Sequence, residues 1–426
     1  MINVRDPVER AVLVAAPRKG SADAEQLVEH LDELSQLVDT AGAQVVGRLS
    51  QQVAAPNPST LIGEGKVEEL RAAVADENAS LVIFDEELTP VQGTNLEREL
   101  NVRVMDRAEV ILDIFSTRAR SHEAKLQVEL AQLEYLLPRL TRMWTHLSRI
   151  RGGIGLRGPG ETQLETDRRM IRRKIQHLRR KLKDVAMHRE VVRSGRQPML
   201  EVALVGYTNA GKSSLLRGLT GGHDILVEDR LFATLDTVTR DVDMGEGIRV
   251  RLTDTVGFIR KLPHHLVASF RATLEEATSA SLLLHVVDAS HPEWEEQMTV
   301  VDSVLAELGL AERRRLIAFN KIDLLPDPFG FAARVRELHP GSVLTTVMRT
   351  DGLQSLRQAL RERAQAVRPT VQVEVPSTDG ARLAALYRAG EVIAREDRED
   401  RVILTIRTEP WRADQLRAEG GRRIEA

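Results

Sequence analysis

The sequence predicts a multidomain α/β chain with four parts, and three observations lead to this fold class. Apolar runs of strand length alternate with helix-like periodicity over residues 1–117 and again over 197–368, as in parallel α/β domains. Residues 118–196 instead carry two heptad seams, which indicate an antiparallel helical hairpin arm, and residues 369–426 have the pattern of a small α+β domain. The length of 426 residues fits this division, because roughly 150 residues per domain suggests about three globular domains.

Composition excludes several classes of protein. Apolar residues make up 42% of the chain and aromatic residues 3%, so aliphatic side chains must form most of the core. The formal net charge of −3 gives no whole-chain argument for nucleic-acid binding. The absence of cysteine excludes disulfides, thiolate catalysis and zinc sites built on Cys. Residues 1–7 lack the apolar core of a signal peptide and no apolar run approaches the ~20 residues of a membrane span, so we expect a monomeric cytoplasmic protein.

Strands and helices are expected to alternate in the first part. Strands are expected at residues 11–15, 44–49, 81–84 and 102–105. Helices are expected at residues 66–74, from Ala108 onward, and after a Ser21 cap, where helical spacing marks Leu27, Leu31, Leu34 and Val38. The turn Gly63-Glu64-Gly65-Lys66 lacks the spacing of a nucleotide-binding loop and is interpreted as a helix start. In the last part we expect a strand at 371–375, a helix at 380–389, and strands at 392–394 and 402–406 paired around a charged turn.

The helical hairpin is predicted from apolar residues spaced alternately four and three apart. The first seam comprises Leu126, Leu130, Leu133, Leu137, Leu140, Trp144 and Leu147, and the second comprises Ile171, Ile175, Leu178, Leu182, Val185 and Val192. Arg189 interrupts the second seam, and Pro138 should kink or break the first helix. Glycine and proline disfavour a helix over residues 151–160, so we expect a tip loop there, with Thr162 and Glu165 as the capping box that restarts the helix. An arm of ~28 residues reaches about 40 Å.

A phosphate-binding loop follows the apolar run at residues 202–205. Residues 206–213 match the pattern G-x-x-x-x-G-K-S/T, and Leu215 opens a helix directly after them. Glycine lets backbone N–H groups surround phosphate oxygens, and the helix N-terminus adds partial positive charge. Lys212 should reach the β- and γ-phosphates, and Ser213 should bind Mg²⁺. The predicted P-loop comprises Gly206, Tyr207, Thr208, Asn209, Ala210, Gly211, Lys212 and Ser213.

A second motif, Asn320-Lys321-Ile322-Asp323, indicates which base is bound. It follows the apolar run at residues 316–319, so it should lie at the carboxyl end of a strand, where α/β sheets bind ligands. The two oxygens of Asp323 match the N1–H and the exocyclic amine of guanine, whereas adenine would leave a buried carboxylate unsatisfied at a cost of several kcal/mol. Asn320 can contact guanine and brace the P-loop, and the stem of Lys321 can cover the base. Together the two motifs predict a P-loop GTPase domain over residues 197–368.

Two segments between these motifs are expected to sense the γ-phosphate. Asp254-Thr255-Val256-Gly257 follows a strand, so that Asp254 should hold Mg²⁺ through water and the Gly257 N–H should contact the γ-phosphate. The segment Phe232-Ala233-Thr234-Leu235-Asp236-Thr237-Val238-Thr239 should change order with the bound nucleotide, and one of its threonines should complete the Mg²⁺ shell. Spacing leaves Thr234, Thr237 and Thr239 open as the second Mg²⁺ ligand. A further guanine-contacting loop is placed at Thr346-Val347-Met348, before Gly352.

The residue after Gly257 predicts slow hydrolysis. Many GTPases have Gln there to orient the attacking water, but Phe258 cannot hydrogen-bond to water. We therefore expect slow intrinsic GTP hydrolysis that a partner accelerates. His264 and His265 lie nearby, and a surface or packing role is favoured for them over that of a catalytic base.

The second half of the hairpin is strongly basic. Between Asp167 and Arg196, twelve Lys or Arg stand against three Asp or Glu, and residues 139–160 contain five Arg and no acid. A solvated coiled-coil face usually has mixed charge, so this one-sided charge favours attraction to RNA phosphates. The tip loop has little side-chain bulk and can enter a narrow RNA pocket. The predicted RNA contacts are Arg151, Gly153, Arg157, Gly158 and Gly160.

These motifs resemble the HflX family of bacterial ribosome-associated GTPases. Residues 152–165 (GGIGLRGPGETQLE) resemble the family's signature loop, and residues 60–66 resemble its N-terminal domain. The resemblance covers nearly the whole chain and implies binding to the large ribosomal subunit and its rRNA, with the tip loop directed at the catalytic centre. It also implies GTP-dependent splitting of stalled or idle 70S ribosomes. It assigns the Mg²⁺ ligand to Thr234, which leaves Lys212, Thr234 and Gly257 as the expected catalytic groups.

Two other interpretations differ in the partner. A large-subunit assembly or RNA-remodelling GTPase would co-sediment with subunit precursors and never with 70S particles. A signalling switch with a protein partner would bind that partner with little dependence on salt, and the basic arm argues against it.

Overall fold

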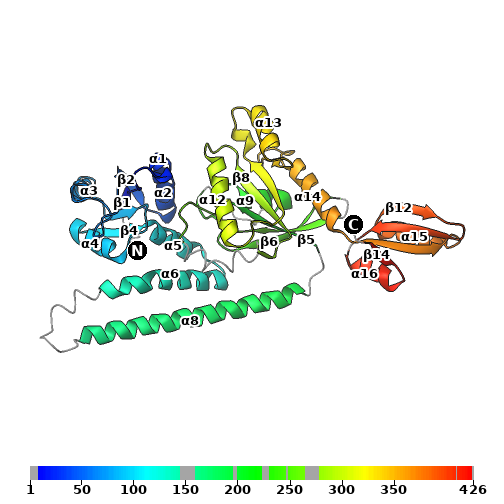
Figure 1. Ribbon diagram of the computed structural model, residues 1–426, viewed down its shortest axis with the longest axis horizontal. Helices are drawn as coiled ribbons and strands as arrows, with labels where there is room; N and C mark the ends of the chain where they lie inside the picture. Colours follow the sequence, from blue (N-terminus) through cyan, green and yellow to red (C-terminus); the bar gives the residue numbers. More distant parts are fainter. Residues whose placement is uncertain are drawn as a thin grey trace, which may run out of the picture.

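The computed structural model describes residues 8–143, 159–194, 199–222, 230–245, 248–263, 278–408 and 410–424. Three sheets follow one another along these residues, and two long helices lie side by side, the first of them packed against the first domain (Figure 1). The multidomain α/β fold class predicted from the sequence is confirmed. None of the described helices combines the length and the apolar character needed to cross a lipid bilayer.

The first sheet is parallel, with the strand order β2-β1-β3-β4. All four predicted strands form, as β1 (Arg10–Ala15), β2 (Gln44–Ser50), β3 (Leu81–Phe84) and β4 (Arg103–Asp106). The helices are α1 (Ala22–Glu25), α2 (Leu27–Ala41), α3 (Glu64–Asp76), α4 (Pro90–Leu100) and α5 (Arg107–Arg118).

Two features of this domain differ from the prediction. The helix expected after Ser21 is divided at Gln26, and the Ser21 hydroxyl donates to the carbonyl of Arg18 at 2.6 Å in place of capping the helix. Helix α4 was not predicted, although Thr89 and Gln92 form a capping box around Pro90. The capping box was a usable signal for the start of this helix, but no clear apolar period follows it in the sequence.

Helices α6 (His122–Met143) and α8 (Pro159–Ser194) form the predicted pair, packed through their apolar seams. Leu126 and Leu130 of α6 are buried against Ile175 and Leu178 of α8. Arg189, which interrupts the second seam, forms an ion pair with a glutamate of α6, so a charge pair replaces the missing apolar contact. The seam prediction is therefore confirmed for the described residues.

Three details of the arm correct or limit the prediction. Helix α6 continues through Pro138, because docking on the first domain offsets the lost backbone bond: Arg139 donates to Leu88 O at 2.9 Å and to Asp106 at 3.0 Å. Helix α8 begins at Pro159, ahead of the predicted capping box at Thr162 and Glu165, since a proline fits the first helical turn, where its missing N–H is not needed. Gly160 thus lies in a helix, whereas Arg151, Gly153, Arg157 and Gly158 lie outside the described residues.

The second sheet has the order β10-β9-β8-β5-β7-β6, in which β6 runs antiparallel to β7 and the other described pairings are parallel. The strands are β5 (Leu200–Gly206), β6 (Val238–Asp243), β7 (Arg249–Asp254), β8 (Leu282–Asp288), β9 (Arg315–Asn320) and β10 (Val343–Leu344). The helices are α9 (Lys212–Thr220), α12 (Trp294–Glu307), α13 (Pro328–Leu338) and α14 (Gln354–Val367), with a 3-10 turn at Ile322–Leu324. Because β5, β7 and β9 are parallel, the three motifs that follow them meet at one edge of the sheet.

The third sheet is antiparallel, with the order β12-β13-β11-β14. It contains β11 (Thr370–Pro376), α15 (Gly380–Ala389), β12 (Glu391–Asp397), β13 (Arg401–Arg407), α16 (Pro410–Ala418) and β14 (Arg422–Ile424). The predicted strand pair is confirmed but longer, since the strands take in most of the charged stretch at 395–401. Strand β12 is an exposed edge strand, where charged side chains are well tolerated.

One apolar core joins the first domain, the start of the arm and the second α/β domain. It contains Leu34 and Phe115 from the first domain, Val128 from α6, and Val205 and Phe258 from the second α/β domain. The three parts therefore share a buried interface.

Candidate nucleotide-binding site

The P-loop leaves β5 through a glycine that no other residue can replace. Gly206 has φ +151°, and a Cβ added there would lie 2.2 Å from the carbonyl oxygen of Val286. At its other end Gly211 has φ +92°, which also favours glycine, and α9 begins at the next residue. This geometry directs the backbone of the loop around a phosphate-sized space ahead of the helix N-terminus.

Lys212 and Asp254 are both buried at this loop, and each shifts the other's titration. Burial lowers the pKa of Lys212 to about 8, although the charge of Asp254 opposes the shift. Burial likewise raises the pKa of Asp254, against the effect of Lys212. The ammonium donates to Gly206 O at 3.1 Å and to Tyr207 O at 2.8 Å. A bound polyanion would stabilise the charged ammonium of Lys212, and a bound cation would stabilise the charged carboxylate of Asp254. The site is therefore suited to a metal-bound phosphate chain.

Three oxygen-bearing side chains, Ser213, Thr234 and Asp254, gather beside the P-loop. The Ser213 hydroxyl lies 2.6 Å from the Thr234 hydroxyl and donates to Asp254 Oδ2 at 2.6 Å. The other carboxylate oxygen of Asp254 is buried, and it finds no hydrogen-bond partner among the described residues. Hard oxygen ligands with an unsatisfied carboxylate oxygen fit Mg²⁺. Of the threonines left open by spacing, Thr234 is the one beside Ser213, whereas Thr239 lies 3.0 Å from Thr253.

The space for the phosphates is closed by the two sensing segments. A Cβ at Gly257 would lie 2.7 Å from Thr208 Cα and 2.9 Å from Lys212 Nζ, so only glycine fits there. Sequence analysis missed Arg230 among the residues that line this cavity, although its place directly before the sensing segment was a usable signal. The lining residues are Thr208, Asn209, Gly211, Lys212, Ser213, Ser214, Arg230, Phe232, Ala233, Thr234, Thr255 and Gly257.

The motif Asn320–Asp323 is braced against the P-loop. Asn320 Nδ2 donates to Ala210 O at 3.0 Å, and the Thr345 hydroxyl donates to Asn320 Oδ1 at 3.2 Å. Thr346 donates to a carboxylate oxygen of Asp323, which brings the predicted loop at 346–348 next to the motif. Val347 and Met348 are exposed.

Asp288 is a further member of this region that sequence analysis missed. It lies at the end of β8, and its carboxylate is 2.7 Å from Lys321 Nζ. Lys321 itself has φ +61°, an unusual conformation for a side chain-bearing residue. The ion pair fixes the end of the Lys321 side chain against the carboxyl end of β8.

Phe258 has a structural role. Its N–H donates to Gly206 O at 3.1 Å, and its carbonyl accepts the Thr208 N–H at 2.7 Å, so its backbone pairs with the P-loop. The side chain is fully buried in the shared apolar core, and Phe258 is not among the residues that line the phosphate cavity. His264 and His265 lie outside the described residues.

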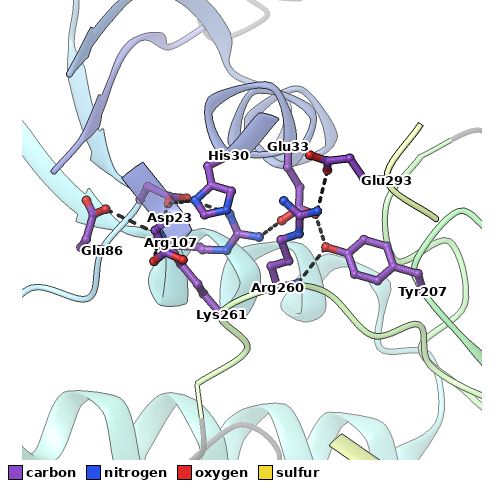
Figure 2. A network of polar contacts seen from close by, with 10 residues as sticks. Asp23, His30, Glu33, Glu86, Arg107, Tyr207, Arg260, Lys261 and Glu293 are labelled. Carbon is purple, nitrogen blue, oxygen red and sulfur yellow. Dashed lines mark hydrogen bonds and ion pairs between the residues drawn. The ribbon is translucent and has the colours of Figure 1, made fainter. Parts of the chain in front are cut away.

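A polar network ties the P-loop and the segment after Phe258 to the first domain (Figure 2). The phenol of Tyr207 donates to Glu33 of α2 and accepts the N–H of Arg260 at 2.9 Å. The guanidinium of Arg260 bonds to Glu293 at 2.5 Å and to Glu296 at 3.1 Å. Tyr207 of the P-loop therefore contacts α2 directly.

The other half of the network centres on a buried carboxylate. Asp85, directly after β3, accepts from Arg107 at 2.8 Å and from Lys261 at 2.6 Å. Arg107 also binds Glu33 (Figure 2). Burial alone would raise the pKa of Asp85, but Arg107 and Lys261 outweigh it and hold that pKa below its usual value. The charges of this interface are thus matched across the two domains.

The fold and this arrangement of motifs define a P-loop GTPase. Three family models match the chain: a GTP-binding GTPase N-terminal region over residues 28–116, its middle region over 118–196, and a 50S ribosome-binding GTPase over 201–321. The chain belongs to the HflX family of GTPases, and it is a GTP hydrolase of a ribosome-associated family.

Two relatives support this assignment over nearly the full length. A GTPase HflX of Magnetococcus marinus is 43% identical over 424 residues, which cover 98% of this chain and 97% of that protein. The GTPase HflX of Escherichia coli is 44% identical over 405 residues, covering 94% and 93%. A GTP-binding protein from Sulfolobus solfataricus, solved in complex with GDP, is 25% identical, covers 84% of this chain and 100% of its own, and has a TM-score of 0.45.

Proposed function

We propose that this GTPase binds the large ribosomal subunit and uses GTP to split stalled or idle 70S ribosomes into subunits. The observation that carries the proposal is the outer face of α8. Its 36 residues span about 54 Å at ~1.5 Å per residue. Six exposed basic side chains on it form no ion pair with any described residue: Arg169, Arg172, Arg173, Arg180, Lys181 and Lys183.

Two other basic residues of α8 lie toward α6 and form ion pairs with it. Lys174 pairs with Glu129 at 2.5 Å and Arg179 with Glu134 at 2.7 Å, and both pairs hold α8 on α6. The outer cations are left for an external polyanion, and ribosomal RNA supplies phosphates at that density. Arg151, Gly153, Arg157 and Gly158 of the predicted tip loop, together with Gly160 in the first turn of α8, would then be carried toward the RNA.

In the same proposal, the site residues have the roles that their placement supports. Lys212 and the P-loop N–H groups hold the phosphates, Ser213 and Thr234 bind Mg²⁺, Asp254 holds it through water, and Gly257 contacts the γ-phosphate. Mg²⁺ would neutralise charge on the β- and γ-phosphate oxygens. Asp323, Asn320 and the loop at 346–348 select guanine. The four parts divide at residues 117, 196 and 368, and the chain acts as a cytoplasmic monomer.

Ribosome-stimulated hydrolysis follows from the position of Phe258. Its side chain is buried in the apolar core, so the position that often supplies the water-orienting group supplies none here. We propose that the bound ribosome completes the site, with slow turnover in its absence.

The test is sedimentation of purified 70S particles with the protein and GTP, GDP or a non-hydrolysable GTP analogue. We expect free subunits with GTP and with the analogue, and none with GDP. The triple variant Arg172→Gln, Arg173→Gln, Arg180→Gln should lose splitting but still bind GTP. The control is the double variant Arg314→Gln, Arg336→Gln, which changes two exposed residues of the GTPase domain and should still split ribosomes. Association only with free large subunits, without splitting, would favour the assembly-factor alternative.

A further inference from the structure

The sensor segment (residues 232–236) is held against α5, the last helix of the first domain, by a strained phenylalanine. Phe232 has φ +54°, a conformation that costs a residue with a side chain on the order of 1 kcal/mol. Its ring meets Phe115 of α5 edge-on, with centroids 4.8 Å apart, and its N–H donates to Thr208 Oγ1 of the P-loop at 3.0 Å. The neighbours Leu231 and Leu235 are buried in the core that the three parts share.

The other end of the sensor segment caps the first helix of the arm. The carboxylate of Asp236 accepts the N–H of Arg120 at 2.9 Å, the N–H of Ser121 at 3.2 Å, and the Ser121 hydroxyl. That hydroxyl in turn accepts the N–H of Ala124 at 3.0 Å, and α6 begins at the residue after Ser121. A carboxylate here satisfies N–H groups that lack an intrahelical partner and opposes the positive end of the helix dipole.

The residue that reaches the metal site lies between these two anchors. Thr234 is two residues from Phe232 and two from Asp236, and two extended residues span at most about 7 Å. Its hydroxyl is 2.6 Å from that of Ser213, so the arrangement in which Thr234 faces the Mg²⁺ ligands is the arrangement in which Asp236 caps α6.

We propose that Asp236 couples the state of the nucleotide to the root of the arm. Mg²⁺ and the γ-phosphate hold Thr234 inward, and the same position of the sensor segment keeps the Asp236 carboxylate on the N-terminus of α6. With GDP the inward position loses its ligand contacts, and the cap is released. The coupling is reciprocal, so an intact cap raises affinity for the triphosphate.

The coupling rests on GTP binding and is independent of ribosome splitting, so the two can fail separately. The first test is hydrogen exchange of the free full-length protein, measured on peptides covering residues 116–124. At saturating Mg²⁺ and a non-hydrolysable GTP analogue, the Arg120 and Ser121 amides should exchange about ten-fold more slowly than with GDP, as expected for amides that bond to a charged acceptor. Asp236→Ala should remove this difference between the two nucleotides.

The second test approaches the contact from the arm, none of whose described residues lines the phosphate cavity. Ser121→Ala should weaken binding of the GTP analogue about three- to ten-fold and change GDP affinity less than about two-fold, since it removes one bond to a carboxylate. Ser116→Ala is the matched control, because that hydroxyl bonds only to Asp113 O of its own helix at 2.8 Å. Equal exchange with both nucleotides, or a Ser121→Ala variant that weakens GDP and the analogue alike, would overturn the proposal.

Discussion

Replacing Gly257 by alanine should separate binding of the triphosphate from binding of the diphosphate. An added Cβ would lie 2.7 Å from Thr208 Cα and 2.9 Å from Lys212 Nζ. Carbon atoms in proteins prefer a separation of about 3.5–4.0 Å, so the segment carrying Gly257 must retreat by roughly 1 Å. Thr208 Cα belongs to the backbone of the P-loop, so it cannot move away unless the loop itself moves.

That displacement sets the size of the effect. A misplacement of about 1 Å costs roughly a hundred-fold in rate, and the N–H of Gly257 is the group expected to contact the γ-phosphate. GDP has no γ-phosphate, so its affinity should change little. The variant should therefore bind a non-hydrolysable GTP analogue more weakly than GDP and hydrolyse GTP about a hundred-fold more slowly.

The assay is titration calorimetry with GDP and the analogue, together with single-turnover hydrolysis with 70S ribosomes present. Gly93→Ala is the control, since a Cβ at that helical glycine meets nothing within 4 Å. Hydrolysis within three-fold of the unaltered protein, or equal losses for GDP and the analogue, would refute the reasoning.

Three further substitutions test the P-loop brace, the buried histidine of β8 and the interface between the domains. Asn320→Ala leaves the buried carbonyl of Ala210 without its donor at a cost of about 1–3 kcal/mol, and should weaken GDP and GTP alike in calorimetry because both carry the base. Burial holds the pKa of His285 at about 3, so the unfolded chain binds a proton there that the folded chain does not. Stability should fall as the pH drops below 6.5, by about 2 kcal/mol at pH 5, and His285→Gln should remove that part of the pH dependence of the urea midpoint. Arg107→Met leaves Asp85 buried without its guanidinium and should lower the unfolding free energy by about 3–5 kcal/mol, visible in the same urea titration.

The predictable parts of this protein are those in which backbone geometry demands a residue type at a set spacing. Gly206 and Gly211 have positive φ at the two ends of the P-loop, so their pattern marks the loop in the sequence. The heptad seams were visible for the same reason, because helical periodicity places apolar residues on one side.

The contacts between domains could not be predicted. Tyr207 and Glu33 are 174 residues apart, Lys261 and Asp85 are 176 apart, and Asp236 and Ser121 are 115 apart. Charged and hydroxyl residues are common on any surface, and no spacing rule links partners on separate domains. The same limit applies to Lys321 and Asp288, which meet only because β8 and β9 are neighbours in the sheet.

The shared apolar core restricts how this protein can be divided. Expressing the GTPase domain alone would remove the residues that pack with Val205, Phe258 and Ile259 in the shared core. The apolar surface exposed in this way favours aggregation. The N-terminal domain, the arm and the GTPase domain therefore belong together in any expressed fragment, and a chimera that replaces one of them needs matching surfaces on the other two.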